Sequence, residues 1–147
     1  MNDIQYMERA IELSKFGEFT TSPNPNVGCI IVKNNIIVGE GWHQKTGNNH
    51  AEINALKIAG NKAQGSTAYI TLEPCNHFGK TPPCCEALIK HGVHRVVIAN
   101  IDPNPKVSGK GVNFLKQRGV IVIVGVMSKK AKKNNYGYFK RMKTGLP

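Results

Sequence analysis

Three side chains that can bind a metal occur in two separate stretches of this chain. His50 offers an imidazole, and Cys75 and Cys84 offer two thiols nine positions apart, each directly after a proline. One histidine and two cysteines supply three of the four ligands that tetrahedral zinc requires. Three protein ligands leave one vertex for water, as in catalytic zinc sites, whereas structural zinc is enclosed by four. We therefore expect a catalytic zinc site held by His50, Cys75 and Cys84.

A carboxylate, Glu52, stands two residues after His50 and is not needed as a ligand. The order H-x-E, followed by P-C and a further cysteine, is typical of zinc deaminases, in which the glutamate moves protons. On a helix, positions 50 and 52 would point about 200° apart. They can share one site only beyond the N-terminus of that helix, where the positive pole of the helix dipole favours an ionised Glu52.

Helix and strand signals alternate along the chain. Helices are expected at residues 3–16, 50–59, 82–90, 112–117 and 128–141. Strands are expected at 27–32 and 36–42, joined by the turn Lys33-Asn34-Asn35, and at 67–72, 94–100 and 120–124. Strands separated by helices after an opening hairpin predict an α/β fold, with a mixed sheet of about five strands between helices in three α/β/α layers.

The composition is that of an ordinary globular protein. A chain of 147 residues with 40% apolar and 20% charged residues suits a single domain. The N-terminal stretch carries charges throughout and lacks the apolar region of a signal peptide, and no stretch approaches the length of a membrane span. Four cysteines, two of them adjacent, make a poor disulfide framework. We expect a cytoplasmic protein with no membrane partner, whose cysteines bind metal.

The net charge of +11 is concentrated toward the C-terminus. Residues 1–102 hold nine basic and nine acidic side chains, whereas residues 103–147 hold eleven basic and no acidic ones. Such a segment could attract phosphate on a small substrate or on nucleic acid. No aromatic residue interrupts the run from Lys129 to Lys133 to stack on bases, although Tyr136 and Tyr138 follow it. A solvated lysine face on a terminal helix is the simpler interpretation.

The candidate ligands stand within longer motifs: SPNPNVG at 22–28, GEGWH at 39–43, HAE at 50–52, TLEPCNHFGKTPPC at 71–84, DPNP at 102–105 and RMKTGLP at 141–147. In these motifs the chain resembles the cytidine-deaminase-like superfamily and, within it, the deaminase domain of the bifunctional riboflavin-biosynthesis deaminase/reductases. Most superfamily members space their cysteines as P-C-x-x-C. The eight residues between Cys75 and Cys84, ending in TPPC, are specific to the riboflavin branch.

The resemblance implies a reaction and a set of substrate contacts. The reaction is hydrolytic removal of the 2-amino group of 2,5-diamino-6-ribosylamino-4(3H)-pyrimidinone 5′-phosphate, which gives 5-amino-6-ribosylaminouracil 5′-phosphate in riboflavin biosynthesis. Zinc-bound hydroxide would attack the ring, and Glu52 would shuttle protons to the ring nitrogen and the leaving amine. The implied substrate-binding residues are Asn24 and His43 at the base edge, His77, Lys80 and Thr81 near the ribose phosphate, and Asp102 and Asn104 as outer contacts.

Two features depart from the family pattern. Cys85 stands where a small residue is usual, so zinc could take either adjacent thiol, and the motif assigns Cys84. The chain also stops where the family normally enters its reductase domain. Either the deaminase works without a fused reductase or the sequence is a truncated part of a longer protein. In both cases residues 1–147 are expected to be one zinc-dependent deaminase domain without a nicotinamide site. The superfamily implies a homo-oligomer, and a separate reductase is a candidate partner.

Two other functions stay open on the sequence alone. A nucleic-acid base deaminase, such as a tRNA adenosine deaminase, is favoured only by the basic segment, and its P-C-x-x-C spacing is absent. A structural zinc in a basic binding module would need a fourth ligand from Cys85 or His77 and would leave Glu52 without a role. We expect a small-molecule deaminase that has no nucleic-acid partner.

Overall fold

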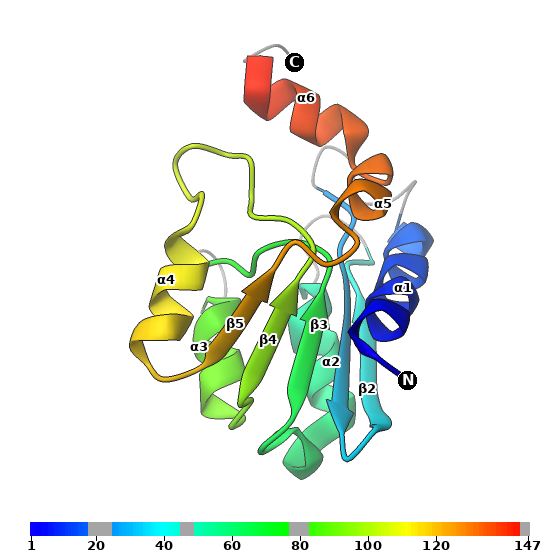
Figure 1. The fold of residues 1–147 in the computed structure, drawn as a ribbon, viewed down its shortest axis with the longest axis vertical. Coiled ribbons are helices and arrows are strands. Elements are labelled where there is room, and N and C mark those ends of the chain that lie inside the picture. Colours follow the sequence, from blue (N-terminus) through cyan, green and yellow to red (C-terminus); the bar gives the residue numbers. More distant parts are fainter. Residues whose placement is uncertain (18–24, 45–48, 77–82, 145–147) are drawn as a thin grey trace.

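The structure, a computed structural model, describes residues 1–17, 25–44, 49–76 and 83–144, and within these ranges five strands form one sheet (Figure 1). The order across the sheet is β2-β1-β3-β4-β5. The strands are β1 (Gly28–Lys33), β2 (Ile36–Trp42), β3 (Thr67–Ile70), β4 (Arg95–Ile98) and β5 (Ile121–Val124). β1 pairs antiparallel with β2 and β3, whereas β3, β4 and β5 run parallel. The predicted mixed sheet of about five strands is confirmed.

Helices cover both faces of this sheet (Figure 1). They are α1 (Asp3–Ser14), α2 (Ala51–Ala59), α3 (Cys84–Lys90), α4 (Lys110–Gln117), α5 (Ser128–Lys133) and α6 (Tyr136–Thr144). Side chains alternate between the faces along β1, so that Cys29 and Ile31 join the core under α2, α3 and α4. Ile30 and Val32 join the core under α1 and α5. The three α/β/α layers follow from this alternation.

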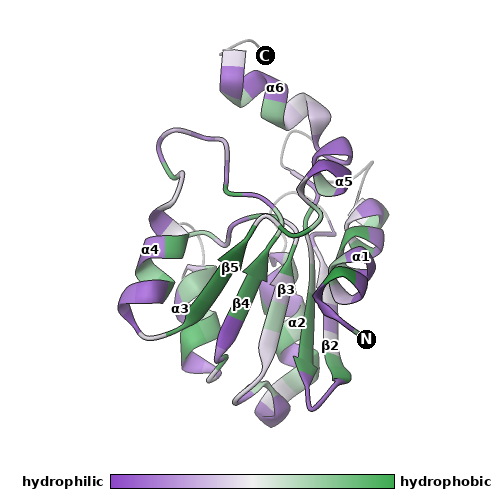
Figure 2. Cartoon of the chain, viewed as in Figure 1, coloured by the Kyte–Doolittle hydropathy of each residue, from purple (hydrophilic) through white to green (hydrophobic). Residues whose placement is uncertain are grey.

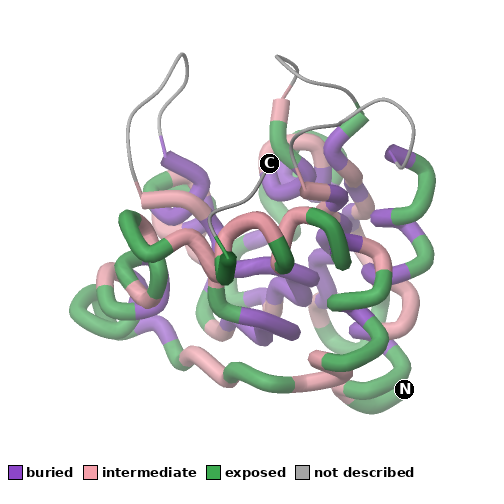
Figure 3. The backbone as a smooth tube through the Cα atoms, turned by 90° about the horizontal axis from the view of Figure 1, so that it is seen from above, coloured by how far each residue is buried: buried purple, intermediate pink, exposed green. Residues whose placement is uncertain are grey.

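The hydrophobic residues lie where these layers meet. Figure 2 shows them concentrated on the strands, while α6 is mostly hydrophilic or neutral. Seen from above in Figure 3, buried residues run through the centre of the molecule and exposed residues follow the outer turns. Cys29 is fully buried in this core, as expected for a small apolar residue.

The opening hairpin fixes where α2 begins. Asn34 and Asn35 turn the chain between β1 and β2 with φ of 52° and 62°, a left-handed conformation that asparagine tolerates. Two glycines of β2 then let α2 approach the strand backbone. A Cβ on Gly41 would stand 2.5 Å from the carbonyl oxygen of Ala51, and one on Gly39 would stand 2.3 Å from that of Ala55. The N-terminus of α2 is therefore held close to the end of β2.

The predicted closing helix at 128–141 is wrong as a single element, because α5 ends at Lys133 and α6 begins at Tyr136. Asn135 turns its side chain away from both helices. Its amide accepts a hydrogen bond from the Asn26 backbone N–H at 2.6 Å and donates one to the Asn26 carbonyl at 2.7 Å. The backbone ends α5 through bonds three residues back, from the Asn134 N–H to the Ala131 carbonyl at 3.3 Å and from the Asn135 N–H to the Lys132 carbonyl at 2.9 Å. The Asn135 pairing holds this junction between α5 and α6 beside the segment before β1.

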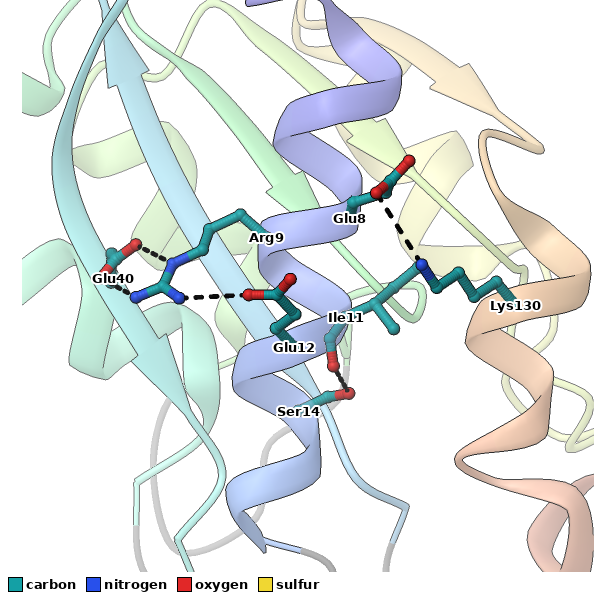
Figure 4. A network of polar contacts seen from close by, with 7 residues as sticks. All are labelled: Glu8, Arg9, Ile11, Glu12, Ser14, Glu40 and Lys130. Atoms are coloured by element: carbon teal, nitrogen blue, oxygen red, sulfur yellow. Dashed lines mark hydrogen bonds and ion pairs between the residues drawn. The ribbon is translucent and has the colours of Figure 1, made fainter.

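Contacts across the surface join this C-terminal segment to α1. In Figure 4, Lys130 of α5 reaches Glu8 at 3.8 Å, and Arg9 reaches Glu40 of β2 at 2.8 Å. Exposed ion pairs of this kind contribute little to stability. They show, however, that part of the basic segment lies beside acidic residues of the N-terminal half.

Replacing Asn135 with alanine is expected to lower the free energy of unfolding by about 1–3 kcal/mol, because the N–H and carbonyl of Asn26 lose a buried partner. Urea unfolding of the two proteins measures the difference. The control is Lys133→Ala, an exposed neighbour that should change stability by less than about 0.5 kcal/mol. Equal effects of the two substitutions would show that the Asn135 pairing contributes nothing.

Candidate metal centre

His50, Cys75 and Cys84 lie together at the carboxyl ends of the parallel strands. The Nδ1 atom of His50 is 3.2 Å from Sγ of Cys84 and 3.8 Å from Sγ of Cys75. All three ligand atoms lie within 4.8 Å of one another. A tetrahedral zinc ion with bonds of about 2.0–2.3 Å separates such atoms by about 3.5–3.8 Å. The donor set and its spacing therefore fit zinc.

The start of α2 brings His50 and Glu52 to one place. His50 is the N-cap residue, with extended backbone angles of φ −69° and ψ 164°, and its ring makes no capping hydrogen bond. Because His50 does not have helical backbone angles, the rotation of 100° per residue does not turn its side chain away from that of Glu52. Both residues line the same cavity in front of the helix N-terminus.

The two sulfurs are coupled through hydrogen bonds. The backbone N–H of Cys84, the first residue of α3, donates to Sγ of Cys75 at 3.2 Å. The pKa of the Cys75 thiol is lowered, chiefly by the hydrogen bond from the Cys84 side chain and also by His50. The pKa of Cys84 is raised, because its thiol is the donor in that pair and is buried. A divalent cation held by these residues would favour the thiolate form of both cysteines.

Glu52 is a buried carboxyl group whose side chain faces the same cavity. It is 3% exposed, and its pKa is raised to about 7, first by burial and next by the neighbouring charge of Cys75. The positive charge of His50 acts in the opposite direction. A carboxyl group that gains and loses a proton near neutral pH is suited to general acid–base chemistry.

Cys85 points away from this centre. Its thiol lies in the apolar core and contacts the carbonyl oxygens of Pro74 at 3.4 Å and Gly111 at 3.7 Å. Burial raises its pKa. Within the described part of the chain, the cluster able to hold a metal consists of His50, Cys75 and Cys84, and Cys85 is not a member. Of the two adjacent thiols, the geometry therefore favours Cys84 as the metal ligand.

A cavity of about 230 Å³ opens in front of the three ligands. Its lining residues are Pro25, Val27, His43, His50, Glu52, Leu72, Glu73, Cys75, Asp102 and Tyr138. His43 is buried in the wall, with its ring centroid 5.4 Å from that of His50 and the two rings edge to face. Its backbone N–H donates to the carbonyl oxygen of Val27. The imidazole that the motif suggested for the base edge thus stands beside the metal centre.

The remaining implied contacts fall into two groups. Asp102 lines the cavity, but Asn104 is not among the lining residues and caps its own loop, accepting a hydrogen bond from the Lys106 N–H at 3.0 Å. The others, Asn24, His77, Lys80 and Thr81, lie outside the described residues.

Sequence reasoning assigned no role to Glu73, which directly precedes the Pro-Cys pair. Its carboxylate is buried and accepts hydrogen bonds from the backbone N–H groups of Asp102 at 3.1 Å, Gly109 at 3.0 Å and Val112 at 2.9 Å. It therefore ties the loop after β3, which carries Cys75, to the loop after β4 and to the start of α4. The sequence did give one indication of this role. Glu73 follows the end of a predicted strand, and the loops at the ends of neighbouring strands lie close together.

Tyr138 was also missed as a cavity residue. It comes from α6, and its hydroxyl donates to Oδ1 of Asp102 at 2.8 Å. The pKa of the phenol is raised, first by burial and then by the Asp102 charge. No local signal marked this residue, because its place depends on how α6 is held against the rest of the chain.

This fold, with a His/Cys/Cys centre and an adjacent glutamate, is that of a zinc-dependent deaminase domain. The family model for the "Cytidine and deoxycytidylate deaminase zinc-binding region" matches residues 1–100. A diaminohydroxyphosphoribosylamino-pyrimidine deaminase of Buchnera aphidicola subsp. Acyrthosiphon pisum is 74% identical over 147 residues, the whole of both chains. The chain therefore belongs to the diaminohydroxyphosphoribosylaminopyrimidine deaminases of this zinc-binding family.

Longer relatives share the same domain. The riboflavin biosynthesis protein RibD of Escherichia coli K12 is 57% identical over all 147 residues, which make up 40% of that protein. The solved structure of Acinetobacter baumannii RibD matches with a TM-score of 0.96 and 55% identity, over 99% of this chain and 41% of that one. A deaminase/reductase of Thermotoga maritima matches with a TM-score of 0.93 and 42% identity, over 99% of this chain and 42% of that one. The chain thus spans about two fifths of these longer relatives.

Replacing Cys84 with serine is expected to weaken zinc binding by more than about 100-fold, because removing a ligand costs more than the 10–100-fold typical of residues that support ligands. Cys85→Ser should bind zinc as the original protein does, because its side chain faces the core. Competition with a chromophoric chelator measures both affinities. Zinc loss confined to the Cys85 variant would reverse the assignment.

Replacing Glu73 with glutamine is expected to lower the free energy of unfolding by about 1.5–3 kcal/mol, since a charged acceptor is lost and an amide NH₂ is turned toward backbone N–H donors. Denaturant unfolding measures the loss. In ¹H–¹⁵N spectra the amide signals of Asp102, Gly109 and Val112 should move most. Glu86→Gln, at an exposed position of α3, is the matched control, and an equal response from it would argue against the clamp.

Proposed function

We propose that this chain hydrolyses 2,5-diamino-6-ribosylamino-4(3H)-pyrimidinone 5′-phosphate at its 2-amino group, giving 5-amino-6-ribosylaminouracil 5′-phosphate and ammonia. The observation that carries the proposal is a buried carboxyl group, Glu52, in one cavity with a three-ligand metal centre. The 74% identity along the full length of a relative with the corresponding name supports this substrate. The long spacing between Cys75 and Cys84 supports it against other deaminases.

The residues can be assigned to the steps of the reaction. His50, Cys75 and Cys84 would hold zinc, which when bound lowers the pKa of water and so supplies a nucleophile at neutral pH. Glu52 takes a proton from the water and delivers it to the ring nitrogen beside the amine-bearing carbon. It then carries the second proton to the amine. One water is consumed, a C–O bond replaces the C–N bond, and ammonia leaves.

Burial suits Glu52 to both proton transfers. A carboxyl group with a pKa of about 7 holds the proton weakly enough to release it and strongly enough to accept it. Because the side chain is almost wholly withdrawn from solvent, the proton stays in the cavity between the two transfers. His43, beside His50, is placed to contact the edge of the base. The roles of Asn24, His77, Lys80, Thr81 and Asn104 stay predictions from the motifs.

We also propose that residues 1–147 act as one deaminase domain in the cytoplasm and assemble as a homo-oligomer, with neither nucleic acid nor membrane as a partner. The cysteines of the described segments, Cys29, Cys75, Cys84 and Cys85, are free thiols, which favours a reducing compartment. Among those segments, no helix is both long enough and apolar enough to cross a membrane. The Thermotoga maritima relative joins the deaminase to a 5-amino-6-(5-phosphoribosylamino)uracil reductase, which supports a reductase, fused or separate, as the user of the product.

Glu52→Gln is expected to keep zinc and to lose turnover by at least about 10²–10⁴-fold, because an amide cannot carry the two protons. Ammonia released from the pyrimidine phosphate measures turnover, and metal analysis measures zinc. Glu12→Gln, an exposed carboxyl on α1, is the matched control and should react at the original rate. Normal activity in the Glu52→Gln variant would remove Glu52 from the mechanism. Deamination of tRNA adenosine in place of the pyrimidine would favour the nucleic-acid alternative.

A further inference from the structure

Asn54 of α2 contacts the backbone beside both histidines that line the cavity. Its side-chain amide nitrogen donates to the carbonyl oxygen of Trp42 at 2.9 Å and to that of Asn49 at 3.4 Å. The first carbonyl belongs to the peptide group that precedes His43, and the second to the peptide group that precedes His50. One amide group therefore holds both ends of the segment that joins β2 to α2.

The backbone around these two histidines is bonded further. The N–H of Asn54 donates to the carbonyl oxygen of His50 at 3.2 Å, as expected for the N-cap residue of a helix. On the other side, the N–H of His43 donates to the carbonyl oxygen of Val27 at 3.1 Å. The peptide group between Trp42 and His43 is therefore bonded at both its oxygen and its N–H.

Asn54 reaches the Trp42 carbonyl because α2 and β2 are in close contact at Gly41. A Cβ on Gly41 would stand 2.8 Å from Cβ of Asn54 and 2.6 Å from the backbone nitrogen of Ala55. A position without a side chain therefore lets the helix approach the strand. Asparagine is a poor residue for the interior of a helix, because its amide competes for backbone groups. Here the amide donates to carbonyls outside the helix.

The two histidine rings lie against one another in this arrangement. The ring centroids of His43 and His50 are 5.4 Å apart, and the ring planes meet at 67°. Nδ1 of His50 is the nitrogen that faces the sulfurs of Cys75 and Cys84. A change in either bonded peptide group would move the ring that follows it. Residues that support a ligand from behind typically change metal affinity or activity by about 10–100-fold.

We propose that Asn54 is a positioning residue, which sets the candidate ligand His50 and the cavity residue His43 relative to one another through the peptide carbonyls before them. It acts on the metal centre through the backbone, since its amide bonds carbonyl groups rather than the ligand atoms. The part of this inference that concerns His43 and the pyrimidine rests on the proposed function. The part that concerns the metal does not.

The first experiment measures zinc affinity in two variants of the full chain by competition with a chromophoric chelator. Asn54→Ala removes the amide without adding a charge, and Asn54→Asp keeps its size but has no N–H to donate. Both should bind zinc about 10–100-fold more weakly. Asn61→Asp adds the same charge at an exposed position beyond the other end of α2 and should bind zinc as the original protein does. Unchanged affinity in both Asn54 variants would overturn the proposal.

A spectroscopic readout distinguishes positioning from a general loss of stability. With Co²⁺ in place of zinc, the visible absorption bands report the geometry of the ligands. These bands should change in both Asn54 variants, and the ring ¹H–¹⁵N signals of His43 and His50 should move in the zinc-saturated proteins. A lower unfolding temperature with unchanged bands and ring signals would show that Asn54 contributes to stability alone, which would overturn the proposal. The aspartate variant keeps the packing against Gly41, so the test stands even where the alanine variant does not fold.

Turnover by the zinc-saturated proteins tests the part that concerns His43. Both Asn54 variants should lose about 10–100-fold in kcat/KM for the pyrimidine 5′-phosphate, with a rise in KM, because the ring at the edge of the base is displaced. Asn61→Asp should react at the original rate. If the original protein releases no ammonia while the Asn54 variants weaken zinc binding and change the cobalt bands, the proposed reaction fails and the positioning role stands. If the original protein is active and the variants equal it in affinity, spectrum and KM, the positioning role fails and the reaction stands.

Discussion

The constraint on which this structure depends is the gathering of negative charge in a buried place. Burial first, and then the neighbouring Cys75 charge, disfavour the ionised form of Glu52 and raise its pKa. The Cys84 N–H at 3.2 Å and the His50 ring relieve part of that cost. A divalent cation relieves far more, because it is attracted to all of these groups at once. The fold thus builds a cluster that is poorly compensated without metal, which couples zinc binding to the stability of the loops that carry the ligands.

The loops at the carboxyl ends of the strands form a connected system rather than independent segments. Glu73 stands two residues before Cys75 and accepts three backbone hydrogen bonds from the following loop and from α4. One of those donors is the N–H of Asp102, whose own carboxylate receives the Tyr138 hydroxyl. A buried carboxylate that accepts three backbone hydrogen bonds is suited to holding these loops together. The metal ligand and the C-terminal helix are therefore linked through two carboxylates.

Features set by residues close together in the sequence could be predicted, whereas features set by long-range contacts could not. The ligands could be found because zinc demands particular side chains, and the hairpin because Asn34 and Asn35 tolerate left-handed backbone angles. The pairing of Asn135 with Asn26 at the junction of α5 and α6 could not, since the two residues stand 109 positions apart. The motif alone favoured Cys84 over Cys85 as the ligand. The geometry agrees, because the Cys84 thiol lies in the cluster with His50 and Cys75 and the Cys85 thiol lies in the core. Tyr138 had no local mark, because its role is set by a tertiary contact.

The uneven charge along the sequence becomes more balanced in the folded chain. Lys130 lies beside Glu8 of α1, and Lys132 lies over the Phe139 ring at 5.6 Å, so both have partners within the protein. Among the described residues, in contrast, the cavity lining includes three carboxyl groups, and Tyr138 of the basic C-terminal helix is part of that lining. Such a pairing of an acidic interior with a basic border attracts an anionic molecule to the border and repels its phosphate from the interior.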